Sequence, residues 1–175
     1  MVKVREEHPL QAGPHFDAGA WLEGFLARSP ERDAALLRRA LGTLGGLRPP
    51  GRPSLHAWGE EVQPLHAGLE ILLILAALGV DDATLVAGLC YRAVAERWLP
   101  EEDLAERFGD EVHELHRGVA LMETIGTLRL TDSGRVLGGT TEQVENIRNM
   151  LVAMTDDVRV VLVKLAERTC ALRAV

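Results

Sequence analysis

Apolar positions in this chain recur with the helical period, and strict alternation of apolar and polar residues is nearly absent. We therefore predict an all-α fold. The segment from His66 to Leu78 is apolar almost all round, so it is expected to be the most buried helix. In the closing segment, apolar residues at alternating steps of four and three share one helical face. These residues are Ile147, Leu151, Met154, Val158, Val161 and Leu165.

Capping residues and helix breakers divide the first third of the chain. Asp17 is expected to cap one helix, and Ser29 followed by Pro30 is expected to begin a second. Gly45 and Gly46 would end that second helix. The stretch 48–53 holds three prolines, which lack the amide donor of a helix, so it is predicted to be a loop.

In the rest of the chain, segments with the helical period again alternate with residues that cap or break helices. Asp81 or Asp82 is placed to cap a helix, and residues 127–139 have the glycines of a long connection. Residues 155–157, Thr-Asp-Asp, could interrupt the closing segment and cap a second helix. The further helices predicted here cover 83–98, 100–109 and 110–125.

Composition narrows the class of protein. The chain has 175 residues, of which 47% are hydrophobic, enough for one core of single-domain size. Its formal net charge of −7 disfavours direct nucleic-acid binding, which depends on clustered cations. The longest near-continuous apolar run, Ile71 to Val80, is far shorter than the roughly 18 residues of a membrane span. With two distant cysteines and no secretory leader, the cytoplasm is the expected location, without membrane association.

The histidines and cysteines that could suggest a metal site or a reactive thiol have simpler structural interpretations. His113 and His116 are three residues apart, but a solvated polar face is favoured over a metal site. Cys90 and Cys170 are interpreted as small core residues. The chain carries no P-loop, no nucleophile elbow and no paired-histidine zinc motif.

Three longer segments, at 66–96, 106–122 and 143–175, together resemble the amino-terminal HD-type hydrolase domain of the RelA/SpoT family. The likeness covers about residues 64–175 and leaves 1–63 as divergent amino-terminal helices and a loop. It implies a single HD-domain-like helical bundle over the 175 residues. The opening MVKVRE and the altered active-site positions look like the RelA branch. The parent protein of that branch is a (p)ppGpp synthetase, a GTP diphosphokinase.

The resemblance also implies where a working relative binds its metal. Such a hydrolase holds one divalent ion, usually manganese, with two histidines and two aspartates on three helices. The matching ligand positions here are Ala67, Tyr91, Arg92 and Glu167, and the catalytic Glu-Asp pair falls on Ala95 and Glu96. Alanine has no donor atom, neutral tyrosine is a weak ligand for a hard cation, and arginine repels one. We therefore expect no bound metal or other cofactor, and no catalytic residue.

The same substitutions suggest a structural replacement for the metal. If the family arrangement is kept, Arg92 and Glu167 reach into the same space from two helices. An ion pair between them would join these helices in place of the metal. The alternative is that Arg92 extends outward past Tyr91 to solvent.

The function that the resemblance implies is that of an inactive hydrolase-like domain with a structural and regulatory role. Its partner would be the synthetase domain of the same polypeptide, which makes (p)ppGpp from ATP and GTP or GDP in the stringent response. The ribosome would be reached through a carboxy-terminal region that this chain lacks. Two alternatives stay open: an active manganese-dependent (p)ppGpp 3′-pyrophosphohydrolase with a relocated site using His66, and a guanine-nucleotide sensor without chemistry.

Overall fold

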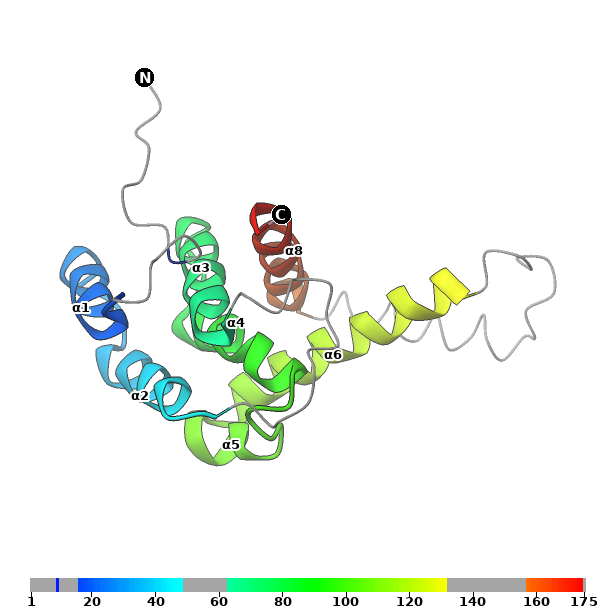
Figure 1. Cartoon of the computed structure of the whole chain (residues 1–175), viewed down its shortest axis with the longest axis horizontal. Coiled ribbons are helices and arrows are strands. Elements are labelled where there is room, and N and C mark those ends of the chain that lie inside the picture. Colours follow the sequence, from blue (N-terminus) through cyan, green and yellow to red (C-terminus); the bar gives the residue numbers. More distant parts are fainter. Residues whose placement is uncertain (1–8, 10–15, 49–62, 132–156, 175) are drawn as a thin grey trace, which may run out of the picture.

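The computed structural model describes residue 9 and residues 16–48, 63–131 and 157–174, with side chains from 123 to 131 left out. This part of the chain is helical and contains no strand, which confirms the all-α prediction. Figure 1 shows the helices arranged as a bundle from which the later part of α6 extends. The helices are α1 (Ala18–Arg28), α2 (Ala34–Gly45), α3 (Pro64–Ala77), α4 (Asp82–Ala95), α5 (Asp103–Phe108), α6 (Asp110–Thr131) and α8 (Val158–Arg173).

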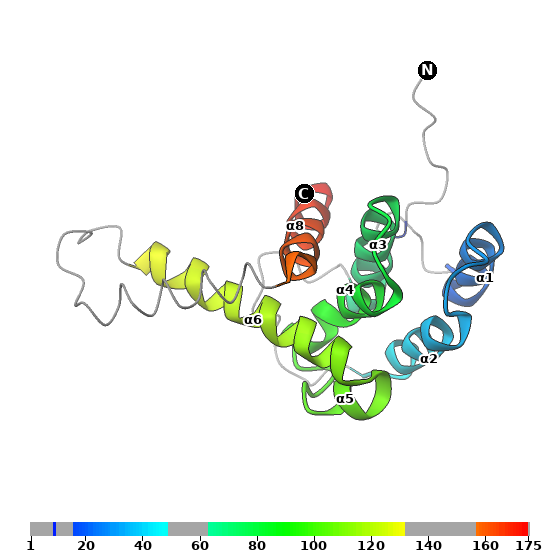
Figure 2. The same ribbon diagram turned by 180° about the vertical axis from the view of Figure 1, so that it is seen from behind.

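Helix α4 occupies the centre of the bundle, with contacts to α2, α3, α6 and α8 (Figure 2). Its residues from Thr84 to Val94 are all buried. The prediction that the segment His66 to Leu78 forms the most buried helix is therefore wrong, and Leu78 is 56% exposed. A helix enclosed by four others buries every side, and hydropathy along the chain does not report that enclosure.

Glycines allow α3 and α4 to approach closely. A Cβ atom at Gly68 would collide with the backbone carbonyl of Leu89. One at Gly88 would collide with the side chains of Leu75 and Ile71. The contact between α3 and α4 therefore depends on the absence of these two side chains.

Side-chain caps define the starts of the first two helices. Asp17 accepts a hydrogen bond from the Ala20 amide at 2.9 Å, as predicted. The prediction that Ser29 and Pro30 begin the second helix is wrong, because Asp33 caps α2 instead. Ser29 ends α1, its amide donating to the Leu26 carbonyl at 3.1 Å. The predicted end of α2 at the glycine pair is confirmed.

Asp81 caps α4, accepting from the Thr84 amide at 2.8 Å. The helix ends at Ala95 rather than at 98, since Arg97 takes a left-handed φ of 63°. Helix α5 begins at Asp103 rather than at 100 and ends where predicted, before Gly109.

Two further boundaries differ from those predicted. Helix α6 continues through Thr131, so the predicted connection at 127–139 is wrong for its first five residues. The rest of that connection, the prolines of 49–53 and the segment with Ile147, Leu151 and Met154 lie outside the described residues.

Helix α8 begins after Asp157, which caps it, so the possible interruption at 155–157 does precede a helix. Its apolar side chains point in two directions. Val160, Val163 and Cys170 are buried against the bundle. On the face that the four-and-three spacing defines, Val158 and Leu165 are turned outward, at 65% and 58% exposed, whereas Val161 is half-buried. None of the described helices has the length and hydropathy to cross a membrane.

Candidate functional site

The residues predicted from the metal positions lie on three adjacent helices. Ala67 is on α3, Tyr91 and Arg92 are on α4, and Glu167 is on α8. All four are buried, with at most 3% of each residue exposed. Helix α8 packs against both α3 and α4, so the fold brings the predicted positions into one region of the interior.

The guanidinium of Arg92 forms its ion pair within its own helix. Its Nε donates to Oε1 of Glu96 at 2.6 Å, and both side chains are nearly inaccessible. Glu96 therefore neutralises the cation from the position where the resemblance had placed a catalytic carboxylate. Ala95, at the other position of that pair, is the last residue of α4 and carries only a methyl group.

Glu167 forms its ion pairs on α8. Its Oε2 lies 2.8 Å from Nζ of Lys164 and 3.5 Å from Nε of Arg168. The predicted direct pair of Arg92 with Glu167 is thus replaced by different partners for each residue. The reason is local: Glu96 and Lys164 each lie one helical turn from the residue that they neutralise.

Lys164 makes a polar contact between α4 and α8. Its Nζ donates to the hydroxyl of Tyr91 at 3.1 Å and lies 5.3 Å from the centroid of the same ring. The ring of Tyr91 also faces that of His116 on α6, with centroids 6.0 Å apart. We call Tyr91, Arg92, Glu96, Lys164 and Glu167 the buried polar cluster.

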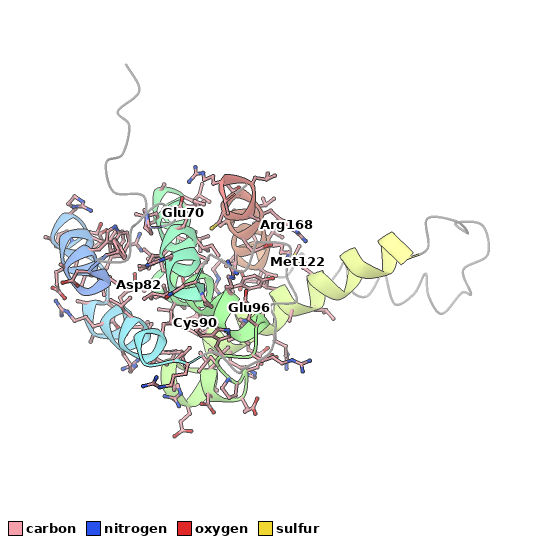
Figure 3. All side chains as sticks on the ribbon, in the orientation of Figure 1. Glu70, Asp82, Cys90, Glu96, Met122 and Arg168 are labelled. Atoms are coloured by element: carbon pink, nitrogen blue, oxygen red, sulfur yellow. The ribbon has the colours of Figure 1, made fainter. Side chains whose placement is uncertain are left out.

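A second polar contact joins α3 to α8. Glu70 is fully buried on α3, and its Oε1 lies 2.6 Å from Nη1 of Arg173 (Figure 3 labels Glu70). Nearby, the thiol of Cys170 contacts the Ala67 carbonyl at 3.7 Å. Burial, reinforced by Glu70, raises the pKa of Cys170 to about 12, so this thiol stays protonated at neutral pH.

Sequence reasoning overlooked Glu70 and Lys164. Glu70 is the one charged residue of an apolar run, and an ionisable group at a core position requires a partner. Lys164 precedes Glu167 by three residues, which places both on the same side of a helix. Both signals were present along the chain, but neither identifies the partner across helices.

The histidines are placed differently from expectation. His116 is 3% exposed and faces Tyr91, so the prediction of a solvated polar face is wrong for this residue. His113 lies nearer the surface, 3.9 Å from Glu101. His66, the residue considered for a relocated site, packs edge-on against Phe16, and burial lowers its pKa.

The residues present do not fit the divalent metal that the family resemblance implies. Ala67 offers a methyl group, Tyr91 accepts a hydrogen bond from an ammonium, and Arg92 contributes a fixed positive charge. Taken alone, without the carboxylate of Glu96, the guanidinium would repel a dication about 4 Å away by roughly 8 kcal/mol at an effective dielectric of about 20. Among the described residues, no three histidine, cysteine, aspartate or glutamate side chains gather as a metal site would require.

Comparison with known proteins gives two findings. The HD domain family matches residues 52–175. A GTP pyrophosphokinase of Haemophilus influenzae is 36% identical over 99% of this chain, and one of Escherichia coli K12 is 34% identical over 100% of this chain. A GTP pyrophosphokinase of Myxococcus xanthus is 37% identical over 74% of the chain.

The match covers a limited part of those relatives. The chain spans 22% of the length of the H. influenzae and E. coli proteins and 15% of the M. xanthus protein. The family match begins before α3 and includes every helix of the candidate site. The chain therefore belongs to the HD domain family and is homologous to about a fifth of the length of bacterial GTP pyrophosphokinases.

Proposed function

We propose that this chain is an HD-type hydrolase-like domain that has lost metal-dependent hydrolysis and serves a structural and regulatory role in a longer GTP pyrophosphokinase. Its relatives are named GTP pyrophosphokinases, and the chain spans 22% of their length. Both observations support a longer parent protein with that activity. In that parent, the synthetase domain would transfer pyrophosphate from ATP to the ribose 3′-hydroxyl of GTP or GDP. This domain would pack against it and bias its conformation.

The observation that carries the proposal is the buried polar cluster. Where a hydrolase needs ligands that attract a dication, this chain has Arg92 and Lys164, each at ion-pair distance from a carboxylate. Both carboxylates, Glu96 and Glu167, already face cations inside the protein. Recruiting them to a metal would strand buried positive charges, which costs about 3–5 kcal/mol for each pair broken.

The partners follow from the same proposal. The synthetase domain is the intramolecular partner, and the ribosome is reached through a region of the longer protein outside these residues. The domain acts in the cytoplasm without membrane or direct nucleic-acid contact. No described contact favours the relocated hydrolase, because the ring of His66 packs against Phe16 and the described residues hold no group of three histidine, cysteine, aspartate or glutamate side chains around it.

Hydrolysis is tested by incubating the purified protein with ppGpp and Mn²⁺ and measuring pyrophosphate. We expect release at the level of a blank without protein, and calorimetric titration with Mn²⁺ alone is expected to show no stoichiometric binding. The matched control is His66→Ala, which removes the histidine that a relocated site would use. Metal-dependent release by the unsubstituted protein that this change abolishes would establish an active hydrolase and overturn the proposal.

The regulatory role is tested in the longer protein. Removing these 175 residues and assaying (p)ppGpp synthesis is expected to change the rate or its response to activation. Equal synthesis by both forms would overturn the regulatory role. Calorimetry of the chain with GDP, GTP and ppGpp then separates a silent scaffold from a nucleotide sensor, because saturable heats of binding occur only for the sensor.

A further inference from the structure

A groove with a volume of about 470 Å³ lies between helix α2 and the turn that leads from α5 into α6. Arg39 and Thr43 line it from α2, and their spacing of four residues places both on one face of that helix. Residues 105–109 form the other wall. Figures 1 and 2 show α2 and α5 next to each other at one end of the bundle. No residue of the buried polar cluster lines this groove, so the two are separate.

The inner surface of the groove is apolar. Phe108 lines it and is only 6% exposed, and Ala105 lines it one helical turn earlier. Gly109 has a left-handed φ of 99°, so α5 turns into α6 there without adding a side chain to the rim. An apolar surface with a few polar groups around it is typical of small-molecule sites, which have volumes of about 300–1,000 Å³.

Arg39 of α2 and Glu106 of α5 bring opposite charges to the two walls of the groove. Both residues are exposed, and in the described part of the chain neither side chain forms an ion pair or a hydrogen bond. Arg107 also lines the groove, but its guanidinium already donates to the carboxylate of Asp103 at 2.9 and 3.2 Å. The groove therefore offers one uncompensated cation and one uncompensated anion.

Thr43 adds a hydrogen-bond acceptor to the wall that carries Arg39. Its hydroxyl donates to the carbonyl oxygen of Arg39 at 2.9 Å. Because the single hydroxyl proton is used in this bond, the lone pairs of the oxygen remain for an external donor. An ammonium group therefore finds acceptors on Thr43 and Glu106, whereas a carboxylate finds the forked N–H donors of Arg39.

We propose that the groove between α2 and α5 binds a small zwitterion with an apolar side chain, namely an amino acid or a short peptide. Its carboxylate pairs with Arg39, its ammonium with Glu106, and its side chain covers Phe108. A simple oxyanion matches Arg39 but is repelled by Glu106, and a simple cation has the reverse difficulty. A ligand that carries both charges compensates both walls at once. This inference goes beyond the proposed function and does not depend on it.

The test is a titration of the chain followed by two-dimensional NMR of its amide groups. Leucine and leucyl-leucine are the two probes, and the tighter of them shows whether an amino acid or a peptide fits better. We expect saturable shifts of the amide signals of residues 39–43 and 105–109, with a dissociation constant on the order of 1 mM. Leucinamide lacks the carboxylate and 4-methylpentanoate lacks the ammonium. Each should bind at least about tenfold more weakly than leucine, because one charged hydrogen bond is lost.

Two substitutions test the residues that carry the proposal. Arg39→Gln and Glu106→Gln should each weaken the binding of leucine about tenfold or more. The matched controls are Arg28→Gln and Glu102→Gln, which make the same changes at exposed positions outside the groove and should leave binding unchanged. All four side chains are exposed, so the variants should fold, and circular dichroism checks that they do.

Four results would overturn the proposal. The first is the absence of saturable shifts with both leucine and leucyl-leucine. The second is equal binding of leucine and either singly charged analogue, which would show that the groove does not recognise both charges. The third is tighter binding of inorganic phosphate than of leucine, which would identify an anion site. The fourth is unchanged binding in Arg39→Gln and Glu106→Gln, which would place the ligand elsewhere. None of these measurements involves hydrolysis or (p)ppGpp synthesis, so failure here is distinguishable from failure of the proposed function.

Discussion

At the scale of single residues, the interior of this domain is governed by charge neutralisation. Arg92 is 3% exposed, and burying a guanidinium without a counter-charge is strongly unfavourable. The carboxylate of Glu96, at 2.6 Å, offsets that cost within one helical turn. Lys164 and Glu167 repeat the arrangement on α8 and extend it to Tyr91. The site thus retains polar residues, and its two cations each lie at ion-pair distance from a carboxylate.

Replacing Glu96 by alanine should destabilise the domain strongly. The change removes the ion-pair partner of Arg92, and breaking a buried pair costs about 3–5 kcal/mol. Chemical denaturation followed by circular dichroism measures the loss of unfolding free energy.

The matched control is Glu23→Ala, which removes an ion pair of similar length to Arg38. Both of those side chains are more than half exposed, so water screens the pair and the denaturation midpoint should hardly move. If the two variants unfolded at the same midpoint, the charge of Arg92 would not depend on Glu96.

At the scale of elements, helix contacts depend on small residues at the crossings. Gly68 on α3 lies against the backbone of Leu89 on α4, and Gly118 on α6 lies against Val160 on α8. A backbone atom cannot move aside as a flexible side chain can. The α3–α4 contact is therefore the least tolerant of added volume.

Gly68→Ala should destabilise the domain, although alanine favours helices intrinsically. The added methyl group would collide with the Leu89 carbonyl and force α3 and α4 apart, at a cost of about 1–3 kcal/mol or more. The comparison is Gly42→Ala on α2, where nothing lies within 4 Å of the new methyl group. The free energy of unfolding of that variant should rise by about 0.5–1 kcal/mol. Thermal unfolding of both proteins would contradict this account if the two changes shifted the midpoint in the same direction.

At the scale of the whole molecule, one arginine joins the amino-terminal ends of three helices. Arg159 contacts Asp81, Glu111 and Asp157 at 2.9, 2.6 and 2.7 Å. These carboxylates belong to the start of α4, the first turn of α6 and the cap of α8. A single side chain on α8 thereby fixes where three helices begin relative to one another.

Acid should weaken this junction. The hydrogen bond from Arg159 is the main cause that lowers the pKa of Asp157 below its ordinary value of 3.8. For Asp81, burial alone would raise the pKa, but hydrogen bonds from Thr84 and Arg159 outweigh it and lower the value. Because both values are lower in the folded state, the stabilisation is complete above about pH 4 and is lost as the pH falls through the folded-state values.

Arg159→Gln should therefore lower stability at pH 7 by about 1–2 kcal/mol, a modest figure because the carboxylates are partly solvated. The difference from the unsubstituted protein should shrink toward pH 2. Thermal unfolding across this range measures it, with Arg28→Gln as an exposed control. A deficit that stayed constant down to pH 2 would mean that Arg159 acts through packing and not through these carboxylates.

The sequence by itself determined the features that depend on local periodicity and capping. It predicted the all-α class, Asp17 as a helix cap, a possible new helix start at 155–157, and the end of α5 before Gly109. Its resemblance to a hydrolase domain also located the positions Ala67, Tyr91 and Glu167 that the fold brings into one buried region. These signals are carried by neighbours along the chain, so they need no knowledge of tertiary contacts.

Only the tertiary structure decided which partner each polar residue meets and which side of a helix faces outward. Arg92 pairs with Glu96 rather than Glu167, and Lys164 of α8 contacts Tyr91 of α4. Leu165 belongs to an apolar pattern and still faces solvent. The physical reason is that spacing groups residues onto a common helical face, whereas the packing of that helix against its neighbours selects the face that is buried.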